Sequence, residues 1–535
     1  MTGWRAPPAL GRISDYPFHY ATVDPGRPAL LFEQDVLSYG GLAERVEVFA
    51  RALYASGVRP GDRVAVLSTP RPEFFVICLA TARLGGIWLG LNPAHTVDEL
   101  TYVLQDAKPR LVFTMARFEG RDYAPDVRRA AHLARSRAEV LPLAGLPDRD
   151  PFLDRAAAAD AAAAATAAAT VTPAQPALIV YTSGSTGAPK GALIRHAGLV
   201  RLGRVESAQW AVPRLRLICN LPIDHIGGVG DLCCVPLVAG GSIVFQQRFD
   251  AQQTLDAIAP YQVTALFQVP TQLQRIAALA GFSTADLSSL RAVGWGGGPL
   301  PLEVIRCYRR LSVALTATYG ATEVTSSVTY TDPGADDEVL AATVGRPDPE
   351  LDVRLLTDDG RWGEAGEEGE VCVRHPSVMA GYYHRPADTA AVFTADGWLR
   401  TGDRGLLRRD GNLRLVARHK EMFKSGGYNI YPREIELALE SHPAVAAAAV
   451  VSRPDADYQA VGVAFIEPQP GTAVTAEELA AWCRQRLANY KVPKQIHIID
   501  SLPLLPVGKI DRPLLARTAT VPSAAPNRER PPAAR

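Results

Sequence analysis

The stretch "YTSGSTGAPKG", residues 181–191, concentrates hydroxyl side chains and glycines directly after the apolar run "ALIV". Glycines let the backbone approach a ligand closely, and successive backbone N–H groups form a nest for anionic oxygens. Lys190 adds a cation, while Pro189 stiffens the turn before it. A flexible surface loop is the alternative for a Gly/Ser run. The position after a buried-looking strand favours a phosphate-binding loop.

A Walker A loop would need four residues between its glycines and a Ser or Thr after its lysine. Here Gly184 and Gly187 enclose two residues, and Gly191 follows Lys190. The hydroxyl that usually binds Mg²⁺ after the lysine is therefore absent. This spacing argues against a P-loop kinase or NTPase, which is one of the two alternative classes.

Further motifs follow this loop in the chain, and each taken alone has an ordinary structural explanation. A glycine turn, a surface Thr-Glu pair or a solvated lysine near a chain end is common. The motifs are "NLPIDHIGGVG" (220–230), "GWGGGPL" (294–300), "TYGATE" (318–323), "LRTGD" (399–403) and "PLLPVGKIDR" (503–512).

Taken together and in this order, the motifs resemble those of the adenylate-forming (ANL) superfamily, which includes acyl-CoA and aryl-CoA synthetases, firefly luciferase and adenylation domains. The resemblance extends over nearly the whole chain, from "LSYGGLAERV" to "VGKIDR". It implies catalytic roles for Lys509, His225, Thr322 and Glu323, with Glu323 binding Mg²⁺. The implied ATP contacts are Thr182, Ser183, Gly184, Ser185, Thr186, Gly187, Lys190, Gly296, Gly297, Gly298, Tyr319, Gly320, Asp403 and Arg418.

The same resemblance implies an acyl pocket formed by His225, Trp295 and Gly320. Trp295 departs from the small residue that the family usually has at this point. We hypothesise that its indole limits the chain length of the acid or stacks on an aromatic acid. Packing of Trp295 in the hydrophobic core is the alternative.

The C-terminal region resembles the mobile domain of the family. Lys420 matches the hinge, and Ser425, Gly426 and Gly427 match the loop that lines the CoA tunnel after the domain rotates. The predicted domains are an N-terminal adenylation domain at 1–419, a C-terminal domain at 420–518 and a disordered tail at 519–535.

The elements that must position these motifs follow from the apolar pattern. Segments such as "LSYGGLAERVEVFARALYASG" and "DRVAVLS" alternate helical and extended spacing, which predicts an α/β fold with a largely parallel, covered sheet. Dense turns and short strands at 343–416 predict a small β-rich subdomain, and the C-terminal domain is expected to be α+β. The alanine-rich segment 155–170 predicts a surface helix or connector.

Composition narrows the class of protein further. The chain has 535 residues with 56 basic and 56 acidic side chains, which gives no indication of a nucleic-acid partner. The N-terminus lacks the pattern of a signal peptide, and no apolar run is long enough to span a membrane. Seven scattered cysteines without CxxC predict buried reduced thiols in a cytoplasmic protein. A homodimer is left open.

The predicted function is activation of a carboxylic acid by ATP to acyl-AMP, followed by transfer to the thiol of CoA. An aromatic or medium-chain acid is expected. A carrier protein or an amine is the alternative acceptor. The second alternative class, a non-catalytic nucleotide-binding relative, is not favoured, because Lys509, Glu323, Asp403 and His225 are all present.

Overall fold

The computed structural model divides the chain into two compact units. The first comprises residues 1–367, 371–401 and 407–414, and the second comprises 368–370, 402–406 and 415–535. The structure describes residues 4–144, 151–182, 189–418, 423–425, 428–430, 432–455, 458–487, 489–506 and 508–520. Within these residues, no helix is long and apolar enough to cross a membrane.

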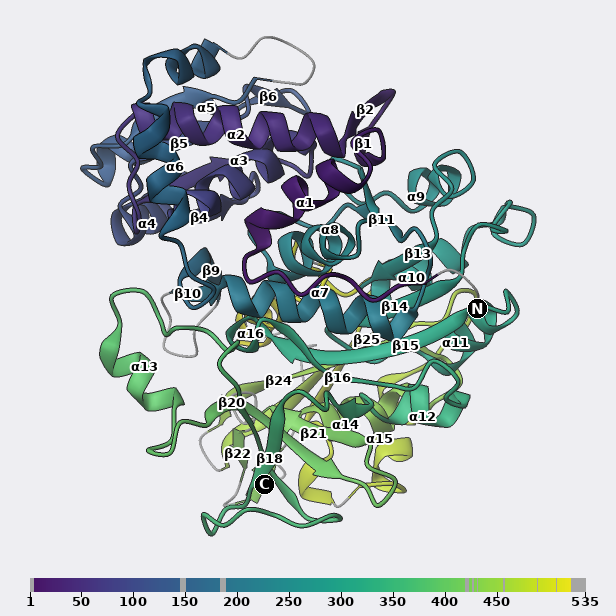
Figure 1. The fold of residues 1–535 in the computed structure, drawn as a ribbon. Helices are drawn as coiled ribbons and strands as arrows, with labels where there is room; N and C mark the ends of the chain where they lie inside the picture. Colours follow the sequence, from purple (N-terminus) through teal and green to yellow (C-terminus); the bar gives the residue numbers. More distant parts are fainter. Residues whose placement is uncertain are drawn as a thin grey trace, which may run out of the picture. The chain divides into compact units, whose positions relative to one another are not determined.

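A six-stranded sheet forms the first part of the first unit, with helices packed against it (Figure 1). Its inner pairs are parallel, as the alternating pattern predicted, and only the edge strand β10 is antiparallel. In sheet order the strands are β10 (Lys190–Arg195), β9 (Pro176–Thr182), β4 (Ile87–Leu91), β3 (Arg63–Leu67), β5 (Leu111–Thr114) and β8 (Glu139–Pro142).

Local sequence determines where the helices of this layer begin and end. Helix α4 (Val97–Ala107) begins with a capping box, in which Thr96 and Glu99 satisfy each other's backbone N–H groups. It ends where Lys108 takes a left-handed conformation with φ of 46°. The other helices here are α1 (Tyr16–Val23), α2 (Tyr39–Ala55), α3 (Pro72–Arg83) and α5 (Ala124–Leu133). A small hairpin joins β6 (Arg117–Phe118) to β7 (Arg121–Asp122).

The alanine-rich segment is helical, which confirms the prediction of a surface helix. It comprises the 3₁₀ helix η2 (Pro151–Ala158) and helix α6 (Ala161–Ala169), which the Asp160 side chain caps. Ala164 and Ala168 are buried, and the Arg12 guanidinium donates a hydrogen bond to the Ala168 carbonyl. The segment therefore buries only a narrow apolar face.

Two further sheets complete the α/β part of this unit. The first is four-stranded, in the order β11 (Arg216–Cys219), β12 (Ser242–Phe245), β1 (Pro28–Phe32) and β2 (Asp35–Ser38). The second has the order β13 (Ala265–Gln268), β14 (Ala292–Gly296), β15 (Ala314–Ala321), β16 (Ser326–Tyr330) and β17 (Arg346–Pro347). A hydrophobic cluster that includes Leu266, Val293 and Leu315 covers one face of the second sheet.

Helix α7 (His196–Trp210) follows β10 and packs against the π-helical segment η3 (Gly227–Cys234), helix α8 (Val235–Val238) and β16 (Figure 1). The remaining helices of the first unit are α9 (Ala251–Ala257), α10 (Pro270–Ala277), α11 (Leu302–Arg309), α12 (Asp337–Ala342) and α13 (Pro386–Val392), with 3₁₀ turns η1 (Ile13–Asp15) and η4 (Thr322–Val324).

The predicted β-rich region at 343–416 is confirmed. It contains β17 and a four-stranded sheet in the order β18 (Asp352–Leu356), β19 (Glu368–Arg374), β20 (Leu399–Leu407) and β21 (Leu413–Arg418). Strands β19, β20 and β21 each contribute residues to both units.

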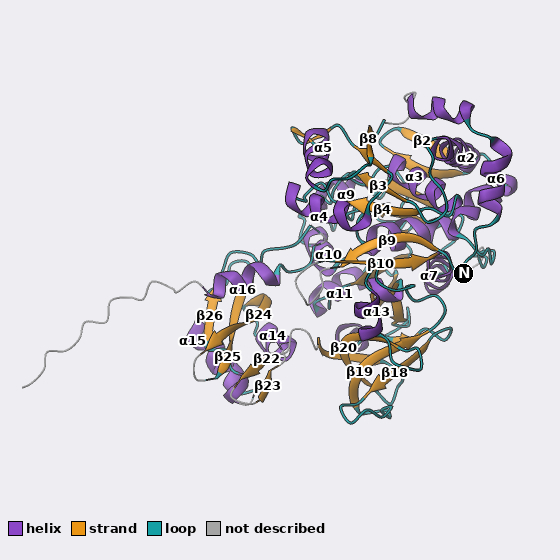
Figure 2. Ribbon diagram, turned by 90° about the vertical axis from the view of Figure 1, so that its left-hand side faces the viewer, coloured by secondary structure: helices purple, strands orange, loops and turns teal. Residues whose placement is uncertain are grey.

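The second unit is an α+β domain (Figure 2), and its described residues form small hydrophobic clusters. Its sheet has the order β23 (Tyr428–Ile430), β22 (Phe423–Ser425), β25 (Gln459–Pro468) and β24 (Val445–Asp455), and β26 (Gln495–Ile498) also pairs with β25. Its helices are α14 (Pro432–Glu440), α15 (Ala476–Arg484) and α16 (Arg512–Thr520), and η5 (Asn489–Lys491) is a 3₁₀ turn.

Candidate active site

The two ends of the predicted phosphate loop are brought together by a hairpin. Strand β9 ends at Thr182, β10 begins at Lys190, and these two residues are partners in the antiparallel register. Ser183, Gly184, Ser185, Thr186 and Gly187 lie outside the described residues. Their predicted contacts with ATP therefore stay predictions.

Glu323 lies beside this hairpin and receives hydrogen bonds from two hydroxyl groups. Thr182 Oγ1 donates to Glu323 Oε1 at 3.4 Å, and the Tyr382 phenol donates to the same oxygen at 2.8 Å. Glu323 belongs to the turn η4, where Thr322 is buried. The structure thus brings the phosphate-loop strand and the "TYGATE" motif together.

Tyr382 is a site residue that the sequence did not reveal. The segment 379–383 runs beside β10, because Tyr383 N–H donates to the Gly191 carbonyl at 2.8 Å and Leu193 N–H donates to the Gly381 carbonyl at 3.0 Å. Burial, and next the Glu323 charge, hold the pKa of Tyr382 well above its usual range. Its phenol therefore stays protonated and can donate to Glu323.

Lys190 is held by side chains that also lie far from it in sequence. Its ammonium group forms an ion pair with Asp388 of α13 and lies 5.6 Å from the centre of the Tyr382 ring. Only 15% of the Lys190 side chain is exposed. The Lys190 ammonium group therefore lies where the phosphate loop ends, beside Tyr382, whose hydroxyl contacts Glu323.

The segment carrying His225 is held against the first sheet. Asn92 donates a hydrogen bond to Asp224 at 3.1 Å, and a Cβ on Gly90 would lie 2.8 Å from the Ile223 carbonyl oxygen. His225 Nδ1 accepts a hydrogen bond from the Gly227 N–H at 3.0 Å. This bond fixes the imidazole at the entrance to η3, and it requires that Nδ1 carry no proton.

The glycines of "GWGGGPL" end strand β14. Gly297 takes φ of 83°, a left-handed conformation that favours glycine, and Gly296 is in register with Thr318 of β15. On β15, Tyr319 is 6% exposed and its phenol donates to Thr401 at 3.2 Å. The "TYGATE" and "LRTGD" motifs therefore meet through these two side chains.

Trp295 is buried in the hydrophobic cluster beside Val293 and is 1% exposed. Side chains alternate along a strand, so Gly294 and Gly296 face the opposite side of the sheet. The proposed contact of Trp295 with the acid stays a prediction.

Two aromatic rings that no sequence motif marked, those of Trp210 and Phe267, lie on the side of β14 that Gly294 and Gly296 face, which we call the glycine face. A Cβ on Gly294 would lie 2.7 Å from the Phe267 ring and 3.5 Å from the Trp210 ring. The two ring centroids are 5.7 Å apart with an interplanar angle of 41°. Because Trp210 ends α7 and Phe267 lies on β13, only the folded chain brings them together.

In the second unit, Asp403 is buried on β20, where Gly402 N–H donates to Glu370 at 3.0 Å. Lys509 lies in a tight turn, because its carbonyl accepts the Leu505 N–H at 2.7 Å and Gly508 takes φ of 76°. Ser425 is buried on β22.

The hinge at Lys420, the predicted boundary at 419/420 and the tunnel residues Gly426 and Gly427 lie outside the described residues, as do residues 521–535 of the tail. Arg418 ends β21, and its side chain is not among those described.

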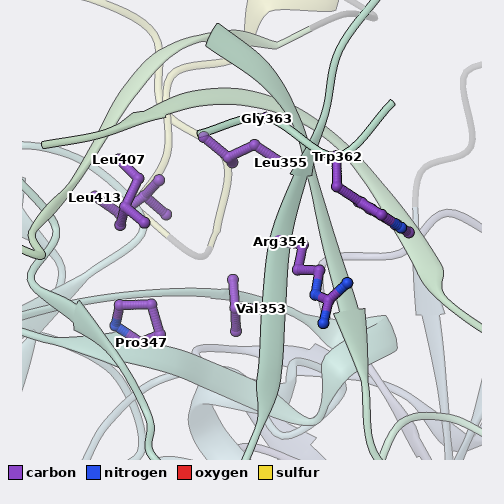
Figure 3. Close-up of a pocket in the computed structure, with 8 residues that line it drawn as sticks. All are labelled: Pro347, Val353, Arg354, Leu355, Trp362, Gly363, Leu407 and Leu413. Atoms are coloured by element: carbon purple, nitrogen blue, oxygen red, sulfur yellow. The ribbon is translucent and has the colours of Figure 1, made fainter. Parts of the chain in front are cut away.

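A separate cavity of about 320 Å³ lies on the β18–β21 sheet (Figure 3). It is lined by Pro347, Val353, Arg354, Leu355, Trp362, Gly363, Leu407 and Leu413. None of the predicted site residues lines it, so it is distinct from the site at Thr182 and Glu323.

The chain matches known proteins along most of its length. Residues 18–383 match the family described as AMP-binding enzyme, and residues 434–509 match the AMP-binding enzyme C-terminal domain. Indoleacetate–CoA ligase from Aromatoleum aromaticum is 36% identical over 93% of this chain and 96% of its own length. Feruloyl-CoA synthase from an Amycolatopsis species is 35% identical over 93% of this chain and 97% of its own length.

A solved structure gives the same result. ATP-bound MatB from Rhodopseudomonas palustris aligns with a TM-score of 0.84 and 30% identity, covering 95% of this chain and 98% of its own. The motifs, the fold and the relatives agree with one another. The chain therefore belongs to the AMP-binding enzyme family, among the AMP-forming acid–CoA ligases of the adenylate-forming superfamily.

Proposed function

We propose that this acid–CoA ligase activates an aromatic carboxylic acid at the site formed by Thr182, Lys190, Glu323 and Tyr382. The observation that carries the proposal is the convergence of these four side chains at the phosphate-loop hairpin. An ammonium group and a carboxylate held by hydroxyls form a pair of charges suited to a triphosphate and its cation.

Mg²⁺ fits the donor set at this point. Glu323 and Thr182 offer hard oxygen atoms, and Mg²⁺ in proteins is commonly held by one or two carboxylates together with substrate phosphates. Bound there, Mg²⁺ would neutralise charge on the phosphates. Within the part of the chain that the structure describes, no cluster of three or more His, Cys, Asp or Glu side chains offers a dedicated metal cage.

In the proposed first step, the carboxylate of the acid attacks the α-phosphorus of ATP, and pyrophosphate leaves. Lys190 and the phosphate loop hold the departing β- and γ-phosphates. Lys509 stabilises the charge that builds between the carboxylate and the α-phosphate. In the second step, the thiol of CoA attacks the acyl carbon and AMP leaves. His225 would line the pocket for the acyl group, and Asp403 would bind the ribose of ATP.

The preference for an aromatic acid rests on two observations. The two curated relatives described above are named for indoleacetate and ferulate, both of which carry an aromatic ring. In this chain, the nearly buried rings of Trp210 and Phe267 lie beside Gly294 on the glycine face of β14, and we infer that the ring of a flat substrate packs next to them. A medium-chain acid is the alternative, because the same rings offer apolar surface to an alkyl chain.

A pyrophosphate-release assay over a panel of acids, with and without CoA, tests the proposal. We expect release that depends on an aromatic acid, and a CoA thioester as product when CoA is present. Release without thioester formation would point to a carrier protein or an amine as acceptor. Release of ADP in place of pyrophosphate would contradict adenylation.

Two lysine variants test the division of roles. Lys509→Ala should abolish acid-dependent pyrophosphate release, because it removes charge stabilisation in the transition state. Lys190→Ala should be milder, with weaker or slower use of ATP, since the loop backbone still binds the leaving phosphates. Equal losses in both variants would show that the roles are wrongly assigned.

A further inference from the structure

The turn that carries Thr322 and Glu323 ends in a strained backbone. Thr325 and Ser326 take φ of 61° and 69°, and neither is glycine. A left-handed conformation costs a non-glycine residue on the order of 1 kcal/mol or more, so the surrounding structure must hold it in place. The turn also packs closely against β15, because a Cβ on Gly320 would lie 1.5 Å from the Ser326 carbonyl oxygen.

Two side-chain hydrogen bonds hold this strained pair. Ser326 Oγ donates to Asp231 Oδ2 at 2.6 Å, and Thr325 Oγ1 donates to the Ser377 carbonyl at 3.0 Å. Asp231 is 3% exposed and Ser326 is 9% exposed, so water competes little for their bond. Asp231 belongs to η3, the π-helical segment that begins two residues after His225. The bond therefore connects the acyl-side segment to the adenylate-side turn.

Helix α7 contributes two buried charged residues, Arg201 and Glu206, one beside each of these bonds. Arg201 forms an ion pair with Asp348, and its Nε donates to Ser377 Oγ at 3.1 Å. One turn and a half further along α7, Glu206 is fully buried, and Asp231 is the charged group that acts on it most strongly. No described group meets either Glu206 oxygen in ordinary hydrogen-bond geometry.

We propose that Asp231, backed by Glu206, is a positioning residue for adenylation: through Ser326 it holds the strained turn in the orientation that Thr322 and Glu323 need. The inference rests on the proposed adenylation at this site. Asp231 is buried, and its proposed action passes through Ser326 and the backbone between Ser326 and Glu323.

Protonation explains how the two carboxylic acids Asp231 and Glu206 can be buried next to each other. Two carboxylates buried side by side cannot both ionise, so at least one proton is retained. Burial is the main reason that the pKa of Asp231 rises to about 7 and the pKa of Glu206 rises well above its ordinary value. The other titratable and charged groups that interact with the pair are Arg201, Tyr330 and Cys234, and Asp348 is the ion-pair partner of Arg201.

Variants at Ser326 and Asp231 test the inference, with Ser242→Ala as the matched control. Ser242 is also a buried serine, and its hydroxyl donates to the Pro28 carbonyl at 2.8 Å in another sheet. Ser326→Ala and Asp231→Ala should lower kcat for pyrophosphate release about tenfold per folded enzyme, while Ser242→Ala leaves kcat unchanged. Wild-type kcat in Ser326→Ala, with only reduced thermal stability, would overturn the inference.

The conservative variant Asp231→Asn separates positioning from simple packing. Its amide can accept from Ser326 and donate to Glu206, so kcat should return close to the wild-type value. An ionised Asp231 still accepts from Ser326, and more strongly, so wild-type kcat should not fall as Asp231 loses its proton above about pH 7. A loss of kcat in Asp231→Asn as large as in Asp231→Ala would count against the proposal.

These outcomes stay distinct from failure of the proposed function. A wild-type enzyme that releases no pyrophosphate with any acid contradicts the proposed function itself. The inference is then tested by the affinity for ATP with Mg²⁺, measured for the wild type, Ser326→Ala and Ser242→Ala. This affinity is informative because Thr322 and Glu323 lie on the turn that Ser326 holds in place. Weaker binding in Ser326→Ala alone supports the inference, and equal binding in all three rejects it.

Discussion

At the scale of single residues, Glu323 shows how the site controls one negative charge. Two hydroxyl groups, from Thr182 and Tyr382, donate to the same carboxylate oxygen. Hydrogen bonds to an ionised acceptor are stronger than neutral ones, so the two donors fix the direction in which the carboxylate points. Because the carboxylate group is rigid, fixing Oε1 also fixes the direction of Oε2.

Tyr382→Phe removes the shorter of these bonds and keeps the aromatic ring. We expect kcat/KM for ATP to fall about fivefold to tenfold, because Glu323 loses its orientation while Lys190 keeps its ring contact. Steady-state kinetics at saturating acid would measure the change.

Tyr383→Phe is the matched control for that variant. Tyr383 is 8% exposed, like Tyr382, and its ring lies 5.3 Å from the Arg63 guanidinium carbon, a contact that phenylalanine preserves. Its kinetics should match the wild type. Equal losses in the two variants would mean that the hydrogen bond to Glu323 has no part in ATP use.

At the scale of elements, helix α7 buries several polar side chains, among them His196, Arg201 and Glu206. His196, its first residue, is fully buried. Burial, and next the positive charge of Arg12, lower the pKa of His196 to about 4. The imidazole is therefore neutral in the folded protein at neutral pH.

This shift makes the stability of the first unit depend on pH. An unfolded histidine titrates near 6.5, so between about pH 6.5 and 4 the unfolded chain binds more protons than the folded one. The contribution of His196 is complete above that window and is lost as the pH falls through it. The loss amounts to about 3 kcal/mol at full titration.

His196→Gln should remove this dependence. The difference in free energy of unfolding between wild type and variant should shrink as the pH falls from about 7 to 4, as measured by urea unfolding. His132→Gln, which replaces an exposed histidine on α5, is the control. A wild-type slope that His196→Gln leaves unchanged would assign the acid sensitivity to other groups.

The sequence predicted the elements better than the contacts between them. Apolar spacing predicted the parallel sheet, dense turns predicted the β-rich region, and the helix propensity of alanine predicted a helix in the alanine-rich segment, because all three signals are local. The motif order located Glu323 and Lys190. Tyr382 was missed because it reaches Glu323 only when the segment 379–383 lies along β10.

The same reason explains why the contact between Trp210 and Phe267 beside Gly294 was missed. The two residues are far apart in the chain, and nothing in "ALFQ" or "ESAQW" marks the two rings as neighbours. The space that Gly294 leaves open for them becomes evident only in three dimensions.

At the scale of the whole molecule, the proposed chemistry uses groups from both units. Lys190 and Glu323 belong to the first unit, while Lys509 and Ser425 belong to the second. A rotation between the units at Lys420 would let Lys509 serve the first step and Ser425 the second.

Lys420→Pro tests this rotation, because proline fixes φ and removes a backbone N–H. We expect pyrophosphate release in a single turnover to persist and thioester formation to fall more than about tenfold. Lys420→Ala, which leaves the backbone free, should support both steps. Parallel loss of both steps in Lys420→Pro would place the hinge elsewhere or indicate a folding defect.

The division into two units has a consequence for thermodynamic measurements. Among the described residues, the first unit has a hydrophobic cluster at β13–β15 and the second has clusters on its own sheet. Two-state unfolding is typical of small single domains, so we expect this chain to melt in more than one transition. Substitutions such as Ser326→Ala act on the core of the first unit, and calorimetry must therefore assign each transition to a unit before a stability change is compared with a change in rate.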